Sequence, residues 1–148
     1  MLRAMMALSV ALVSTTEAVA AAASNADAAA VWAREGEYWV KAKQTDLGPY
    51  FGLFRSDFRG WPCGESSTRD LTALKHTGPP IRPSEEVRLD ERETTSAPGL
   101  VLVFYRATLT DHGGPHPGAV RVRYFTHTWT RGAAGWQILG GMCRDAPP

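Results

Sequence analysis

One histidine and two carboxylates are the residues of this sequence best suited to acid–base chemistry: His127, Glu35 and Asp57. An imidazole changes charge near neutral pH, so His127 could accept or donate a proton during a reaction. Glu35, Asp57 and Tyr105 are its candidate partners, which only folding could bring close to the ring. The alternative is structural, because a histidine inside a sheet can satisfy its ring nitrogens with neighbouring groups.

The two carboxylates also have structural alternatives. Glu35 lies in an aromatic segment, and apolar surroundings make a carboxylate a stronger base, as removal of a proton from carbon requires. It could instead pair with an arginine such as Arg123. Asp57 could stabilise the turn that follows the second expected helix. Both remain catalytic candidates beside His127, and both structural roles stay open.

Aromatic side chains form the second group of candidate site residues. Their rings could line a pocket for a small apolar or aromatic ligand. A domain of this size also needs such rings for its core, so packing and binding could be divided among them. The candidate ligand-binding residues are Tyr38, Trp39, Tyr50, Trp61, Tyr105 and Trp129.

Several partner classes find no support in the sequence. The 16 Lys and Arg residues balance 15 Asp and Glu residues, so no strong field would draw the chain to nucleic acid. No phosphate-binding loop or dinucleotide fingerprint occurs, and we expect no cofactor. His112 and His116 lie on a Gly/Pro-rich loop that offers no rigid base for a metal, so we expect no metal site.

Residues 1–23 have the features of a signal peptide. Arg3 precedes a short apolar run, and the small residues at 18–20 and 21–23 have the spacing of a cleavage site. The apolar run is too short to span a bilayer, so we expect export to the periplasm or outside the cell and no membrane span. The alternative is an alanine-rich N-terminus with no role in export.

The two cysteines, Cys63 and Cys143, agree with export. In an oxidising compartment the pair could form one disulfide, whereas in the cytosol both would be small buried thiols. The disulfide is therefore a hypothesis that depends on export.

Residues 24–148 have the pattern of one α+β domain. Helical spacing of apolar residues predicts three helices over 24–44, 46–54 and 67–74, with a short strand at 56–62. The second helix is expected to begin at Asp46 and the third at Ser67 or Thr68, which are good capping residues. From residue 83 the period changes to two and predicts antiparallel strands over 83–93, 100–109, 119–131 and 136–143. Helices followed by a strand meander indicate an α+β fold.

The strand over 119–131 contains His127, and its alternation separates two faces. One face carries Arg121, Arg123, Phe125, His127 and Trp129, and the other carries Val120, Val122, Tyr124, Thr126 and Thr128. A one-residue bulge would exchange the two faces, so either could line a cavity.

Four short motifs together resemble a known superfamily. They are the helix with Glu35 and Tyr38-Trp39, the DFRGWP turn at 57–62, THTW at 126–129 and GWQI at 135–138. In these motifs the chain resembles the nuclear transport factor 2-like (SnoaL-like, cystatin-like) superfamily, and within it the domain-of-unknown-function 4440 group. The resemblance implies a cone, in which a curved antiparallel sheet wraps around helices. It also implies that related chains include isomerases, dehydratases and polyketide cyclases as well as domains that only bind or dimerise.

We therefore expect an exported domain that binds a small apolar or aromatic ligand or forms a homodimer, without established catalysis. The first alternative is a cofactor-independent isomerase or cyclase that removes a proton next to a carbonyl. In it His127 or Glu35 would be the base, and Tyr105 or Trp61 would donate a hydrogen bond to the developing oxyanion. The second alternative is a purely structural homodimer that pairs through its exposed sheet face.

Overall fold

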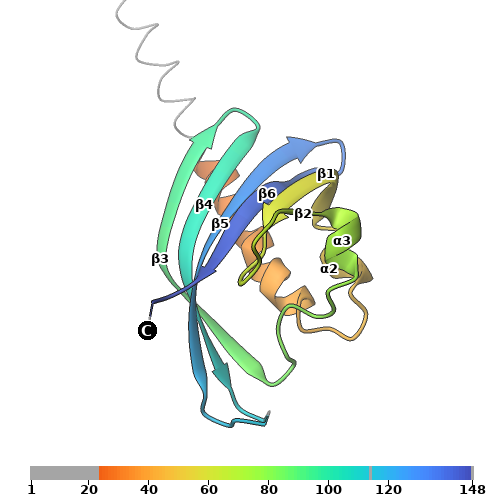
Figure 1. Ribbon diagram of the computed structural model, residues 1–148. Helices are drawn as coiled ribbons and strands as arrows, with labels where there is room; N and C mark the ends of the chain where they lie inside the picture. The colour runs from red at the N-terminus through yellow and green to blue at the C-terminus, as the bar shows by residue number, and fades with distance from the viewer. Residues whose placement is uncertain (1–23, 114, 148) are drawn as a thin grey trace, which may run out of the picture.

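A curved six-stranded sheet wraps around one long helix in this protein. The computed structural model describes residues 24–113 and 115–147. Its strands lie in the order β2-β1-β6-β5-β4-β3, and Figure 1 shows the N-terminal helix, in orange, lying against one side of the sheet. The signal peptide expected at 1–23 lies outside the described residues. Among the described residues, no helix combines the length and apolarity needed to cross a membrane.

The N-terminal helix is helical over 24–41 and buries one face against the sheet. Val31, Glu35, Tyr38 and Trp39 are all buried, and they recur at the spacing of neighbouring helical turns. The helix gives way to turns after residue 41, a few residues before the predicted end. The predicted helical stripe is thus confirmed, and it places a carboxylate on the buried face.

The two short helices differ from their predicted boundaries. Helix α2 spans only Gly48–Phe51, because Gly52 follows and Phe54 already belongs to a strand. Asp46 does contribute, since its Oδ1 accepts a hydrogen bond from the Gly48 N–H at 2.8 Å. Helix α3 spans Leu71–Lys75 and is capped by Asp70, which accepts from the Ala73 N–H at 2.8 Å. The predicted caps at Ser67 and Thr68 were therefore wrong.

The strands confirm the meander and correct one pairing. They are β1 Phe54–Trp61, β2 Arg69–Asp70, β3 Glu85–Ala97, β4 Leu100–Asp111, β5 Val120–Gly132 and β6 Gly135–Asp145. Strands β3 to β6 pair antiparallel in sequence order, as predicted. Strand β1 instead pairs parallel with β6, so the sheet is not wholly antiparallel. Periodicity predicts that a strand exists but carries no information about which distant strand it joins.

Bulges bend the sheet around the helix. One lies in β3 between Asp90 and Glu93, where Glu91 has a φ of 52°. Another lies in β6 opposite the Thr128–Trp129 step of β5. An extra residue on one strand increases local twist and bend, which produces the concave face. On β5 this face carries the buried Phe125, His127 and Trp129, one of the two faces predicted from alternation.

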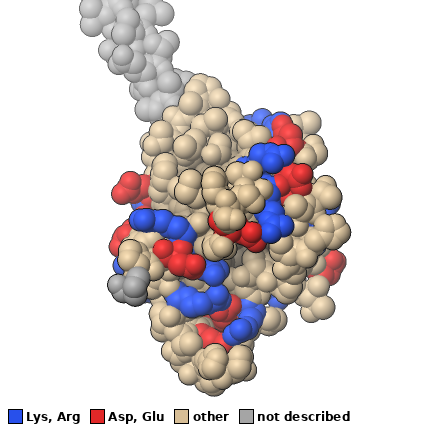
Figure 2. Space-filling model, viewed as in Figure 1, with Lys and Arg blue, Asp and Glu red and all other residues tan. Residues whose placement is uncertain are grey.

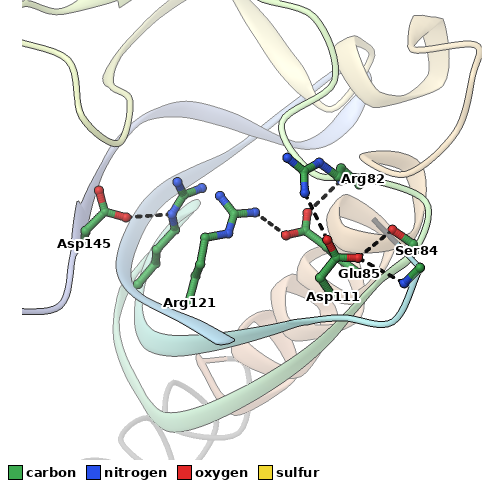
Figure 3. Close-up of polar contacts among 8 residues, drawn as sticks. Arg82, Ser84, Glu85, Asp111, Arg121 and Asp145 are labelled. Atoms are coloured by element: carbon green, nitrogen blue, oxygen red, sulfur yellow. Dashed lines mark hydrogen bonds and ion pairs between the residues drawn. The ribbon is translucent and has the colours of Figure 1, made fainter. Parts of the chain in front are cut away.

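One disulfide and two ion pairs add links between segments of the sheet. A disulfide joins Cys63, just after β1, to Cys143 on β6, with Cα atoms 4.6 Å apart. Farther along the sheet, Figure 3 shows Arg121 pointing to Glu85 and Arg82 pointing to Asp111. Both carboxylates are buried, so their pairing with arginine satisfies charges that would otherwise be costly.

Candidate functional site

The concave face of the sheet contains a cavity of about 110 Å³. Most of its lining is apolar, and four of the six rings predicted to bind a ligand line it. The lining includes Tyr38, Trp39, Tyr50, Phe54, Phe58, Trp61, Ile81, Arg123, Phe125 and His127. An apolar cavity of about 150 Å³ holds benzene, so this cavity has the scale of a single small ring.

Glu35 is the centre of a buried hydrogen-bond cluster behind this cavity. Its side chain is fully buried, and its Oε1 accepts from the indole Nε1 of Trp129 at 2.6 Å. Its Oε2 accepts from the hydroxyl of Tyr105 at 3.0 Å. The His127 Nδ1 lies 2.8 Å from Oε1. Two donors and one imidazole nitrogen therefore converge on the two oxygens of a single carboxyl group.

The Glu35 contact determines which nitrogen of His127 is free to react. Because Oε1 already accepts from an indole, which can only donate, it also acts as the acceptor for Nδ1–H. The neutral ring then carries its lone pair on Nε2. Within the described residues Nε2 makes no hydrogen bond, and the ring lines the cavity. A buried carboxylate thus orients an imidazole whose basic nitrogen is available to a ligand.

A pair of tyrosines lies beside the histidine. The Tyr50 hydroxyl donates to the Tyr38 hydroxyl at 3.2 Å, and the ring of Tyr38 lies 4.9 Å from the ring of His127. Burial raises the pKa of Tyr38 to about 12 and holds that of Tyr50 well above its usual range. Both hydroxyls therefore stay protonated at neutral pH. Since Tyr38 accepts from Tyr50, its own proton can be donated into the cavity.

Close backbone packing on β6 fixes the position of the histidine. Gly141 lies opposite His127, and a Cβ at this position would overlap the Thr126 carbonyl oxygen and lie 2.7 Å from His127 Cδ2. Only glycine leaves room for the imidazole there. The glycine pair of β6 thus shapes the site because it has no side chains, and it contributes no functional group.

Arg123 brings a positive charge to the same cavity. It lies on the concave face of β5, lines the cavity, and its Nε donates to Asp145 Oδ1 at 2.9 Å. The alternative pairing of Glu35 with Arg123 is therefore wrong, because each has other partners. The alternation of β5 predicted Arg123 on the face of His127, and pairing with Glu35 was the one role expected for it.

Three predicted site residues, Asp57, Tyr105 and Trp129, lie away from the cavity, and a fourth, Trp61, lies at its mouth. Asp57 is exposed and pairs with Arg55, so it lies outside the Glu35 cluster. The hydroxyl of Tyr105 donates to Glu35, and Trp61 Nε1 donates to the Glu65 carbonyl at 2.7 Å, so neither expected oxyanion donor is free. Trp61 is 42% exposed, which places it where the cavity meets solvent. Tyr105 and Trp129 support Glu35 rather than line the cavity.

The hydroxyl pair was not predicted as a source of donors, because Tyr38 and Tyr50 were expected only to offer ring surface. A tyrosine on a buried helical stripe must place its hydroxyl within the fold, and this requirement could have indicated the pair. Among the described residues, no three His, Cys, Asp or Glu side chains gather as a metal site would require.

Comparison with known proteins shows the fold. No family model and no curated protein matches the chain. A candidate dehydratase of the NTF2-like family from Streptomyces avermitilis matches with a TM-score of 0.68 at 11% identity, over 80% of this chain and 94% of that chain. A candidate ketosteroid isomerase from Parabacteroides distasonis gives 0.62 at 15% identity, over 80% and 86%. The CaMKII hub of S. rosetta gives 0.66 at 13% identity, over 79% and 95%.

These matches establish that the chain has the NTF2-like, cystatin-like α+β fold. The fold class predicted from the four motifs is therefore confirmed. Identities this low carry no information about chemistry, since the same fold occurs in a candidate isomerase and in a kinase hub. Function must be argued from the residues of the cavity.

Proposed function

We propose that this protein is a cofactor-independent isomerase that moves a proton on a small carbonyl compound. The observation that carries the proposal is the buried Glu35–His127 pair, whose free Nε2 belongs to a ring lining an apolar cavity. A cavity lined by aromatic rings alone would favour a binding protein. Here a positioned base and a hydroxyl donor are present together, and this favours catalysis.

The reaction needs two events that the cavity residues can perform. His127 Nε2 takes a proton from the carbon next to the carbonyl, and the electron pair of that C–H bond moves toward the carbonyl oxygen. Tyr38 donates a hydrogen bond to this developing enolate oxygen, while Glu35 stabilises the imidazolium. The imidazolium then returns the proton to another carbon of the enolate. No electrons enter or leave, so the reaction requires no redox cofactor.

Deuterium exchange tests this proposal without a known natural substrate. Single-ring ketones such as cyclohex-3-enone are incubated with the protein in D₂O, and NMR follows deuterium uptake beside the carbonyl and formation of the conjugated isomer. We expect catalysed exchange with the wild-type protein and a loss of about 10²–10⁴-fold in His127→Gln. The matched control is His112→Gln, because His112 is exposed and pairs with Glu86.

The outcome that contradicts catalysis is equally specific. If His127→Gln folds with unchanged near-UV circular dichroism and still exchanges at the wild-type rate, His127 is not the base. If no ketone of the panel exchanges above the buffer rate, the cavity would serve binding alone.

We also propose that the outer face of the sheet joins two copies of the chain. Phe104 on β4 pairs with Thr126 on β5, which pairs in turn with Met142 on β6, so these side chains form a row across three strands. Phe104 is 37% exposed and Met142 is 53% exposed. Structural neighbours include proteins called association domains, which agrees with such pairing. Exposed apolar side chains such as Phe104 and Met142 on one sheet face are typical of a protein interface.

The mass in solution tests the dimer. We expect sedimentation equilibrium to give twice the chain mass for the wild type and the single mass for Phe104→Glu, because a charge in an apolar interface is costly. Val40→Glu is the matched control, since Val40 is exposed on the N-terminal helix. A monomeric wild type at high micromolar concentration would rule out the interface.

We propose in addition that the chain is exported and, from the four motifs of its sequence, that it belongs to the domain-of-unknown-function 4440 group. The Cys63–Cys143 disulfide supports export, because such bonds persist in oxidising compartments. When the full chain is expressed in a Gram-negative host, we expect it in the periplasm without its first residues. Intact protein retained in the cytoplasm, still beginning at Met1 by mass spectrometry, would contradict export.

A further inference from the structure

We propose that the substrate is a small carboxylate whose body is no larger than a single ring, and that Arg123 binds the carboxylate group. This substrate class rests on the proposed function, because it concerns the same cavity in which His127 acts. Arg123 is then a specificity-determining residue and takes no part in proton transfer.

The contacts of Arg123 leave one edge of its guanidinium free. The side chain is 18% exposed, and Nε donates to Asp145 Oδ1 at 2.9 Å. Within the described residues, Nη1 and Nη2 make no hydrogen bond. Two parallel N–H groups on one planar edge match the two oxygens of a carboxylate. Arg123 can therefore hold Asp145 and a ligand at the same time.

The neighbouring arginines are held differently. Arg121 pairs with Glu85 and Arg82 pairs with Asp111, and both of these acids are buried (Figure 3). The partner of Arg123, by contrast, is 56% exposed and is the last residue of β6. Solvent weakens the hold of such an acid on its arginine. The positive charge of Arg123 is therefore less compensated by its partner than the charges of Arg82 and Arg121, and it can interact more strongly with a ligand.

The charge of Arg123 reaches the reacting groups of the cavity. Burial raises the pKa of Tyr38, and the guanidinium of Arg123 acts in the opposite direction on the same hydroxyl. Most of the remaining lining is apolar, including Phe54, Phe58 and Ile81. A cation beside such a surface is best satisfied by an anion with an apolar body. On the face seen in Figure 2, acidic and basic groups are interspersed, so this face offers no patch of one sign that would select an anion.

The spacing along β5 sets the shape of the ligand. Arg123, Phe125 and His127 lie on one face, so the Cα atoms of Arg123 and His127 are separated by roughly 13 Å of strand. The long arginine side chain covers part of this distance, and the ring of Phe125 lies between the two. A ligand ring can stack on Phe125 with its carboxylate toward Arg123 and its reacting carbon toward His127. The volume of about 110 Å³ is below the roughly 150 Å³ of a cavity that holds benzene, so a ligand body larger than one ring would have to extend toward solvent.

Equilibrium binding tests this assignment separately from turnover. Isothermal titration of the wild-type protein uses benzoate, its neutral analogue benzamide, the two-ring 1-naphthoate, and inorganic sulfate as an anion without an apolar body. We expect benzoate to bind at least tenfold more tightly than each of the others. Arg123→Gln should remove the preference of benzoate over benzamide. Arg144→Gln is the matched control and should keep it, because Arg144 is exposed and lies over Tyr124.

A second variant keeps the assignment testable if Arg123→Gln does not fold. Asp145→Asn removes the competing charge from an exposed position, and we expect it to tighten benzoate binding several-fold without affecting benzamide. Equal affinities for benzoate and benzamide, or sulfate binding as tightly as benzoate, would overturn the proposal. If His127→Gln keeps wild-type benzoate affinity while deuterium exchange was never catalysed, the isomerase proposal fails and the carboxylate site stands.

Discussion

At the scale of single residues, the donors around Glu35 decide how His127 is held. Trp129 and Tyr105 occupy both carboxylate oxygens, so the imidazole meets an acceptor whose position is already set. Such a buried network is rigid when every member is satisfied, and it loses that rigidity when one member changes. Glu35 is therefore a positioning residue, since it acts on the substrate through His127.

Glu35→Gln should affect stability and exchange together. The amide offers one acceptor oxygen to three donors, so at least one buried donor loses its partner, which costs about 1–3 kcal/mol. Deuterium exchange should fall by about 10²-fold or more, because Nδ1 no longer meets a carboxylate. Urea denaturation and NMR exchange measure the two effects. Glu37→Gln on the same helix is the control, since Glu37 is half-exposed and should change stability by less than about 1 kcal/mol. Wild-type exchange in Glu35→Gln would remove Glu35 from the mechanism.

The buried tyrosines make stability fall at alkaline pH. Burial raises the pKa of Tyr38 to about 12 and the pKa values of Tyr50 and Tyr105 well above the usual range. In the unfolded chain each phenol loses its proton near pH 10, so unfolding releases protons above that pH. Each buried, protonated phenol makes its full contribution to the free energy of unfolding below pH 10. This contribution is lost progressively as the pH rises toward the pKa of the phenol in the folded state.

We expect the free energy of unfolding to decrease by roughly 1 kcal/mol per buried tyrosine between pH 8 and pH 11. Urea denaturation at the two pH values measures the change. Tyr38→Phe removes one titrating group and should lose less stability over the same interval. An identical loss in wild type and variant would show that Tyr38 does not contribute. Absorbance at 295 nm provides an independent measure, because buried phenols should ionise only on unfolding.

At the scale of elements, strand β5 shows what a sequence can predict. Its alternation placed Phe125, His127 and Trp129 together, because side chains on a strand must point to opposite faces in turn. Three candidate hydrogen-bond partners of His127 were predicted: Glu35, Asp57 and Tyr105. The sequence could not choose among them, because Glu35 lies on a helix that is distant from β5 in the chain. The parallel pairing of β1 with β6 could not be predicted, because the sequence of neither strand indicates its distant partner. Sequence periodicity determines faces, whereas tertiary contacts determine partners.

The glycine pair of β6 gives a test at this scale. Gly141→Ala should lower stability by about 1–3 kcal/mol, because its Cβ meets the Thr126 carbonyl and the His127 ring. Displacement of the ring should also reduce deuterium exchange. Gly132→Ala is the control, since a Cβ there meets no atom within 4 Å and stability should change by less than about 0.5 kcal/mol. Similar stabilities for the two variants would show that β5 and β6 pack less closely than described.

At the scale of the whole molecule, the concave sheet provides both the core and the cavity. The rings of Trp39, Tyr105 and Phe125 pack against one another, and the rings of Tyr38 and Tyr50 face the remaining space. The motifs predicted the cone because they fall on its N-terminal helix, on β1 and on its last hairpin; the motif expected to form a turn at 57–62 lies mainly within β1. They could not divide the rings between packing and binding, since that division depends on how far the bulges open the sheet.

The disulfide is a property of the whole molecule that bears on the proposed export. Cys63 and Cys143 are separated by 80 residues, and closing a loop of this length stabilises the fold by about 4 kcal/mol in the chain-entropy treatment. Reduction should therefore lower the free energy of unfolding by up to that amount, and Cys63→Ser with Cys143→Ser should reproduce the loss without reductant. Thiol titration of unfolded protein from the periplasm should find no free thiol. Two free thiols in that protein, or equal stability with and without reductant, would show that the chain folds independently of the bond.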